Sequence, residues 1–346
     1  MENVKMKFAV GYQLPEEDEE PFVEIVRDFQ QNIAEVYFPW LNMSSGRSPM
    51  TMRDGVYDWE GQQKLEKDLI AFKKMGIKLD LLLNANCYGK DSLSKNFENM
   101  ICSIVAHLKD LVGLDIVTTT SLMVARTVKN NFPDIDVRAS INMRIGTIKA
   151  MEYIANLFDS FNIQREYNRD FQRIVEMKEL ADKHNKKLYL LANSGCLNFC
   201  SGQIFHDNLV AHESEIGCTQ NIEGWNPCVC WNYYSRKENW PTFLQNSWIR
   251  PEDLYNYEPY FSTVKLATRM HANPRKVIQA YAGKKFNGNL IDLFEPGHSL
   301  LLIPHIIDNS KFPKDWFEKI STCDKNCHKC SYCTKVLNHV LVKIAS

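Results

Sequence analysis

Eight short runs of strand-forming residues are spaced along the chain, and amphipathic segments separate most of them. In 61–74, the apolar residues Leu65, Leu69 and Phe72 recur at steps of four and three, the period of a helix with one buried face. The segments 147–158 and 169–184 show a similar pattern. The expected strands are 7–11, 34–38, 78–83, 114–118, 136–141, 162–165, 187–191 and 263–267.

Strands that alternate with helices predict parallel strands joined by crossover helices. Eight strands fit a closed (β/α)8 TIM-like barrel, which is an α/β fold. A doubly wound open sheet is the structural alternative. No Gly-x-Gly-x-x-Gly sequence follows the first expected strand, and this weakens the dinucleotide-binding version of that alternative.

The regular alternation stops after the seventh expected strand. We expect a barrel over 1–296 that is interrupted by a cysteine-rich insertion at about 192–262, and a cysteine-rich extension over 297–346. The insertion also holds four tryptophans, which we expect to form its core rather than a stacking platform. These are Trp225, Trp231, Trp240 and Trp248.

Composition narrows the function classes. Hydrophobic residues make up 45% of the 346 residues and charged residues 24%, as in ordinary globular proteins. The formal net charge of −1 offers no basic excess for a large RNA substrate. The first residues lack the pattern of a signal peptide, and no apolar run approaches the roughly 18 residues of a membrane span. We therefore expect a protein of the reducing cytoplasm.

Eleven cysteines in a reducing compartment indicate metal binding or redox chemistry rather than disulfides. Five of them fall in the insertion, and the first follows the seventh strand, where barrels place their active sites. Four thiolates can hold either an iron–sulfur cluster or a structural zinc ion, and spacing alone does not separate the two. The five candidate cofactor ligands are Cys196, Cys200, Cys218, Cys228 and Cys230.

The order and spacing of several segments resemble the collagenase-like peptidase family (peptidase family U32), over about residues 7–285. Members of this family include iron–sulfur proteins of oxygen-independent ubiquinone synthesis and of RNA hydroxylation. The matching segments are Ala34-Glu-Val-Tyr-Phe38, Leu81-Leu-Leu-Asn-Ala85, Ile163-Gln-Arg-Glu166, Asn193-Ser-Gly-Cys196, Ile249-Arg-Pro-Glu-Asp-Leu254 and Thr263-Val-Lys-Leu-Ala-Thr-Arg269.

This resemblance implies a barrel with a 4Fe–4S cluster on cysteines of the insertion, and it favours iron–sulfur over zinc. The chain also departs from the family pattern. Asn193 stands where the family has a histidine, and Ala267-Thr268 replaces Glu-Gly before Arg269. The substrate can therefore differ from those of the better-known branches.

A second group of cysteines lies in the tail, where four occur within eleven residues. The first three match the spacing of radical S-adenosylmethionine enzymes, but they follow the barrel instead of its first strand, and too few residues come after them. We expect a second iron–sulfur cluster or a structural zinc ion at this group. The candidate metal ligands are Cys323, Cys327, Cys330 and Cys333.

Four charged residues are the candidate catalytic groups. Arg165 and Glu166 end the expected sixth strand, where they could bind a carboxylate and move protons, or merely form an ion pair at the barrel rim. Lys265 lies within the eighth strand and Arg269 follows it. Lys265 could face the site or pair with a buried acid.

The leading hypothesis is an iron–sulfur enzyme for oxygen-independent hydroxylation, or another redox modification, of a small molecule or a modified biopolymer. Such an enzyme would work with an electron donor or a partner subunit. A non-catalytic, cluster-bearing partner subunit and a peptidase are the alternatives. No nucleophile–base pair is evident for the peptidase.

Overall fold

The computed structural model describes residues 6–16, 18–41, 43–47, 58–221, 224, 226 and 228–344. Trp225 and the first five residues, on which the signal-peptide expectation rests, lie outside the described residues. Within the described part of the chain, no helix is long and apolar enough to cross a membrane.

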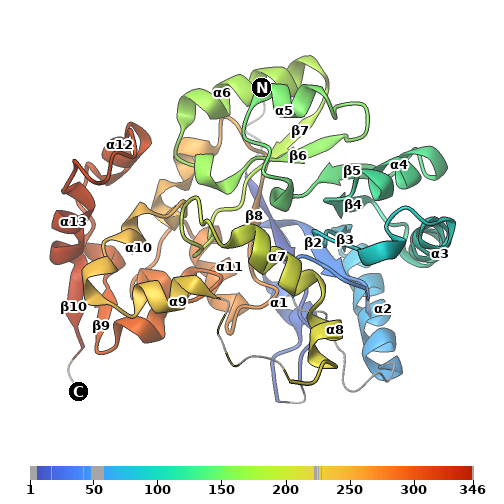
Figure 1. Cartoon of the computed structure of the whole chain (residues 1–346), viewed down its shortest axis with the longest axis horizontal. Helices are drawn as coiled ribbons and strands as arrows, with labels where there is room; N and C mark the ends of the chain where they lie inside the picture. Colours follow the sequence, from blue (N-terminus) through green and yellow to red (C-terminus); the bar gives the residue numbers. More distant parts are fainter. Residues whose placement is uncertain are drawn as a thin grey trace.

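Parallel strands β1–β8 form the centre of the molecule in the order β7-β6-β5-β4-β3-β2-β1-β8 (Figure 1). A parallel bridge between Leu191 and Lys265 joins the two ends, so that the sheet closes as a TIM-like barrel. The backbone amides of Ala192 and Lys265 donate across this seam, to Lys265 and Leu190. The strands are β1 Lys7–Gly11, β2 Ile33–Pro39, β3 Lys78–Leu83, β4 Ile116–Thr119, β5 Asp136–Ala139, β6 Ser160–Asn162, β7 Lys187–Tyr189 and β8 Thr263–Leu266.

The first six helices follow the strands of the barrel, as the sequence pattern predicts. Leu65, Leu69 and Phe72 of α2 are fully buried, which confirms the amphipathic assignment of this segment. These helices are α1 Phe22–Asp28, α2 Trp59–Lys74, α3 Lys95–Val112, α4 Leu122–Asn131, α5 Ile148–Glu152 and α6 Phe171–Lys183. Helix α11, Pro274–Ala282, follows β8.

Helix α3 illustrates how the sequence sets these boundaries. The Ser94 hydroxyl accepts a hydrogen bond from the Phe97 amide, which is a standard N-cap. The helix ends at Gly113, whose φ of 63° suits a residue without a Cβ. One face is buried against the barrel, at Phe97, Ile101, Val105, Leu108 and Val112.

The segment between β7 and β8 folds into short helices at one end of the barrel. These are α7 Gln203–Ala211, α8 Glu213–Gly217, α9 Val229–Tyr234 and α10 Thr242–Gln245. Trp240 and Trp248 are buried there, as expected of core tryptophans, whereas Trp231 is only half-buried.

The C-terminal region packs beside α9 and α10 (Figure 1). It contains α12 Trp316–Ser321, α13 Tyr332–Val340 and an antiparallel pair of strands, β9 His305–Ile307 and β10 Leu341–Lys343. Trp316 is buried and stacks on Trp248 at 5.8 Å between ring centroids. The tail is therefore attached to the barrel region by an aromatic contact.

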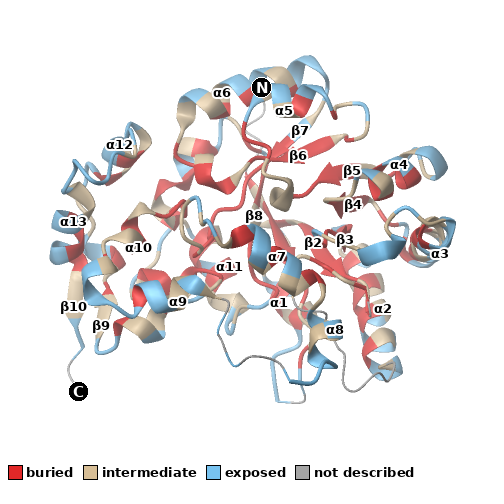
Figure 2. Cartoon of the chain, viewed as in Figure 1, coloured by how far each residue is buried: buried red, intermediate tan, exposed pale blue. Residues whose placement is uncertain are grey.

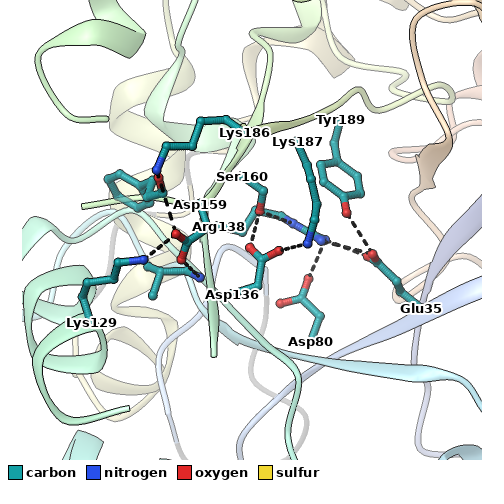
Figure 3. Close-up of polar contacts among 12 residues, drawn as sticks. Glu35, Asp80, Lys129, Asp136, Arg138, Asp159, Ser160, Lys186, Lys187 and Tyr189 are labelled. Carbon is teal, nitrogen blue, oxygen red and sulfur yellow. Dashed lines mark hydrogen bonds and ion pairs between the residues drawn. The ribbon is translucent and has the colours of Figure 1, made fainter. Parts of the chain in front are cut away.

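Burial is concentrated in the strands and on the inner helix faces (Figure 2). Charged residues nevertheless occupy the barrel interior near the N-terminal ends of the strands (Figure 3). The Arg138 guanidinium is 2% exposed and donates to both carboxylate oxygens of Glu35, at 2.7 and 3.1 Å. It also lies 3.4 Å from Asp80 and stacks 3.7 Å from the centre of the Tyr189 ring.

This network shifts the ionisation of both acids. Burial would raise the pKa of Glu35, but Arg138 outweighs that effect and holds it below the usual value. Burial raises the pKa of Asp80 to about 6, and Arg138 opposes this rise only in part. Arg138 is therefore the cation that both buried acids share.

The sixth strand is placed differently from the prediction. It spans Ser160–Asn162 and ends before Arg165, which begins a 3-10 turn, η3 Arg165–Tyr167. The buried residues Ser160 and Phe161 supply the strand, and the polar residues after Asn162 form the turn at the mouth. Helix α5 is also shorter than the expected 147–158.

Candidate functional site

Asn193 holds together the carboxyl ends of three segments at the barrel mouth. Its side-chain oxygen accepts from the Ala267 amide at 2.6 Å, and its side-chain nitrogen donates to the carbonyls of Ala267 and Leu293, both at 2.9 Å. The side chain is fully buried. Asn193, which replaces the family's usual histidine, thus has a structural function in this chain.

The residues after Asn193 lie alongside the segment that contains Glu295. The Gly195 amide donates to the Glu295 carbonyl at 3.0 Å, and the Glu295 amide donates to the Asn193 carbonyl at the same distance. A Cβ on Gly195 would lie 2.1 Å from the Pro296 carbonyl oxygen, so only glycine fits at this position. This close approach fixes where Cys196 leaves the barrel.

A small cavity of about 60 Å³ lies at the carboxyl ends of the strands, and we call it the inner cavity. Its lining brings together three of the predicted catalytic residues, Arg165, Lys265 and Arg269. Asn84 and Asn142, which follow β3 and β5, line it as well. The sequence did not point to the ion pair of Arg47 and Glu295, 2.9 Å apart, which completes the charged part of this lining.

Arg165 and Glu166 are both buried, at 5% and 4% exposure. Their side chains form a loose ion pair, 3.5 Å from Nε to Oε1. Glu166 does not line the inner cavity and faces a different one, which is described below. The two neighbouring residues therefore serve opposite sides of the η3 turn.

Lys265 points into the barrel, with its ammonium 3.9 Å from the centre of the Tyr37 ring. Burial lowers its pKa to about 8, and Asp80 opposes this shift. Arg269 donates to the Ser45 hydroxyl at 3.0 Å and is also buried. Burial lowers the pKa of Arg269 to about 10, which the neighbouring Glu295 counteracts.

A second cavity of about 670 Å³ adjoins the first, because Arg47 and Glu295 line both. We call it the outer cavity. Two of the predicted cofactor ligands, Cys196 and Cys228, line it together with His206 and Trp231. The Cys228 sulfur lies 3.8 Å from the His206 Nε2.

Four of the five insertion cysteines lie near one another. Burial raises the pKa of the Cys230 thiol to about 12, and the nearby thiols of Cys196, Cys228 and Cys200 add to the rise. Cys218, the fifth, is exposed and follows α8. In the described residues, no three His, Cys, Asp or Glu side chains are placed to hold a metal ion. The thiols are thus neighbours without converging on one point.

The tail cysteines lie against the barrel. Three of them, Cys323, Cys327 and Cys333, line a cavity of about 220 Å³ together with Glu166 and Arg169, and we call it the tail cavity. Cys330, the fourth, does not line it, and of the four only Cys333 is not exposed. Burial raises the pKa of Cys333 to about 11, and Arg169 opposes the rise. Arg169 itself is fixed by hydrogen bonds to the carbonyls of Trp248 and Leu244.

A further cysteine, isolated in the sequence, acquires a partner in the fold. Cys87, which follows β3, lies near His212, which lowers the pKa of its thiol, and the Gly89 amide donates to its sulfur at 3.4 Å. His212 Nδ1 lies 3.1 Å from Glu215 Oε2. The fold thus brings a thiol, an imidazole and a carboxylate together, although Cys87 lies far from His212 and Glu215 in the sequence.

Comparisons with known proteins agree with the resemblance seen in the sequence. A protein of Methanocaldococcus jannaschii, described as an uncharacterized protease, is 27% identical over 286 residues, which cover 81% of this chain and 82% of the relative. The solved structure of a U32 peptidase superposes with a TM-score of 0.52 over 76% of this chain and 92% of that one, at 13% identity. No family model matches the chain. The chain resembles U32 peptidases, and the structural match shows that the barrel fold is shared.

Proposed function

We propose that this chain is an iron–sulfur enzyme that carries out a redox modification, such as an oxygen-independent hydroxylation, at the carboxyl end of its barrel. The observation that carries this proposal is the position of the thiols. Cys196 and Cys228 border the outer cavity, whose wall of Arg47 and Glu295 is shared with the charged barrel mouth. A cofactor at these thiols would lie beside the place where barrels bind their substrates.

The proposed ligands of a 4Fe–4S cluster are the four neighbouring thiols Cys196, Cys200, Cys228 and Cys230. Four thiols from one loop region match the donor set that such clusters require. Exposed Cys218 is the cysteine left over. When bound, the cluster would supply single-electron transfer, with an external protein or small molecule as the electron partner.

The chain's own residues then have separate tasks. Arg165 and Arg269 bind and orient the substrate through their guanidinium groups. Lys265, with a pKa near 8, can hold or release a proton in the barrel mouth. Trp231 lines the outer cavity and would shield a bound substrate there from water. Glu166 faces the tail cavity, so we assign it to positioning Arg165.

Single replacements test the ligand set. Cys196→Ala and Cys230→Ala should each lower the iron and sulfide content by one cluster after anaerobic reconstitution. Cys218→Ala and Cys87→Ala are matched controls, because each removes one partly or fully exposed thiol, and both should keep the iron of the full chain. Loss of the cluster in Cys218→Ala, or its retention in Cys196→Ala, would disprove this assignment.

We propose a second metal site at Cys323, Cys327, Cys330 and Cys333. Four thiols within eleven residues can close around a metal with little help from the rest of the fold. Iron, sulfide and zinc counts in Cys330→Ala, compared with the full chain, would distinguish a zinc ion from a second cluster. Equal metal content in the two proteins would refute the site.

The second candidate function is a thiol peptidase, and Cys87 with His212 and Glu215 is the observation in its favour. The relative named as a protease is consistent with it. Metal-free protein that cleaves a casein-derived peptide, and that loses this activity in Cys87→Ala, would support this function. Cleavage that survives in Cys87→Ala would exclude this triad as its source.

A further inference from the structure

The lining of the inner cavity has an excess of positive charge. Of the described residues, four cations line it, namely Arg47, Arg165, Lys265 and Arg269, against the single carboxylate of Glu295. That carboxylate is already engaged, because its Oε1 pairs with Arg47 at 2.9 Å. Cations gathered in a poorly solvated site repel one another unless an anion compensates them.

Arg165 has the clearest unmet requirement. It is 5% exposed, and no atom of the described residues forms a hydrogen bond with its Nη2. Its ion pair with Glu166 is loose, 3.5 Å from Nε to the carboxylate. A guanidinium carries five donors arranged for a planar or tetrahedral oxyanion. Arg165 is buried and lines the inner cavity, so it fits an anionic ligand there.

Glu166 and Asp207, two described acids near Arg165, satisfy it only in part. Glu166 lines the tail cavity rather than the inner one. Asp207 interacts electrostatically with Arg165, but its carboxylate pairs with Arg144 at 3.7 Å and accepts from Asn86 at 3.3 Å. Burial raises the pKa of Asp207, which weakens it further as a counterion for Arg165.

The sizes of the two cavities suit two parts of one ligand. The inner cavity, at about 60 Å³, has room for a few water-sized atoms, the size of a carboxylate or phosphate group. The outer cavity, at about 670 Å³, lies within the range of small-molecule pockets. Arg47 and Glu295 form their common wall, so a ligand can extend from one into the other.

We propose that the inner cavity is an oxyanion subsite, in which Arg165 and Arg269 bind the carboxylate or phosphate group of a small-molecule substrate whose remainder occupies the outer cavity. This inference deepens the proposed function, since it narrows the substrate to a small organic anion. The arginines would recognise the anionic group, and the redox chemistry would take place at the thiols.

Calorimetric titration of the full chain at constant ionic strength tests the subsite. The probes are succinate for carboxylates, glycerol phosphate for phosphates and glycerol as the neutral control. At least one anion should bind with a dissociation constant at least about tenfold lower than that of glycerol, and the anion that binds identifies the head group. No preference for either anion over glycerol would overturn the subsite.

Variants locate the binding. Arg165→Gln should weaken binding of the anion by about tenfold or more, because it removes the positive charge and the paired N–H donors of the guanidinium. Arg165→Lys keeps the positive charge but loses the planar guanidinium, so it should also weaken binding of the anion. It provides a second folded variant if Arg165→Gln is unstable. Arg126→Gln removes one exposed arginine elsewhere and should bind as the parent does. Equal affinity in Arg165→Lys and the parent, or equal loss in Arg126→Gln, would overturn the proposal.

Iron and sulfide counts on the same samples keep the two proposals apart. Anion binding that depends on Arg165 in protein without iron would support the subsite and count against the redox function. Iron-loaded protein that binds the anions no better than glycerol would support the redox function and count against the subsite.

Discussion

Replacing Arg138 with methionine tests the charge network inside the barrel. Methionine keeps an unbranched apolar stem but removes the two hydrogen bonds to Glu35, at 2.7 and 3.1 Å, and the ion pair to Asp80 at 3.4 Å. Both acids are at most 3% exposed, so water cannot replace these contacts. Removing one partner of a buried ion pair costs about 3–5 kcal/mol. The free energy of unfolding of a domain is only about 5–15 kcal/mol, so a loss of this size should be readily measured.

The pH dependence of the free energy of unfolding provides a second test of this prediction. In the parent, Arg138 holds the pKa of Glu35 below its usual value, so this stabilisation is present above the unfolded pKa and is lost as the pH falls through the folded one. Without Arg138, burial raises the pKa of Glu35 above its unfolded value. The variant then becomes more stable as the pH falls from 7 to 5, and the difference from the parent narrows.

Urea unfolding followed by circular dichroism, at pH 7 and pH 5, measures both effects. Lys187→Met is the control, because Lys187 pairs with Asp136 at 2.7 Å in the same region but its side chain is 59% exposed. It should cost less than about 1 kcal/mol. An Arg138→Met variant within about 1 kcal/mol of the parent, or an equal difference at both pH values, would refute the reasoning.

Three further predictions concern other parts of the chain. In the parent, the free energy of unfolding should rise between about pH 8 and 10.5, because Lys265 has lost its proton in the folded chain but still holds it in the unfolded one. Lys265→Met should remove this rise, and an unchanged rise in urea titrations would contradict the prediction. Trp316→Ala should destabilise the chain by about 3–5 kcal/mol and make the tail sensitive to trypsin, since the ring is 1% exposed and stacks on Trp248; an unchanged digestion pattern would count against tail docking. Iodoacetamide at pH 7 should label Cys87 faster than Cys102, whose pKa burial raises, and His212→Ala should slow that labelling; mass spectrometry of the labelled peptides decides.

The barrel could be predicted from the sequence because its signals are local. Strand β3 matches the hydrophobic run at 78–83, and the buried residues of α2 follow the helical period. The sixth strand was placed too late in the chain, because the expected range began at Asn162, where the strand ends, and ran into the turn that starts at Arg165.

The site was less predictable, because it depends on contacts between distant residues. Arg47 follows β2 and Glu295 comes after the barrel, and no motif links them, yet their ion pair forms the wall between the two cavities. Cys87 lacks cysteine neighbours in the sequence and gains His212 only through the fold. Clustering in the sequence did identify the thiols that lie near Cys196, but it could not tell that Cys218 stands apart.

The central claim concerns the cofactor, and metal analysis of the full chain tests it most directly. Protein purified and reconstituted without oxygen should be brown, with broad visible absorption and at least about four iron atoms and four sulfides per chain. Colourless protein that holds zinc alone after reconstitution would contradict the account.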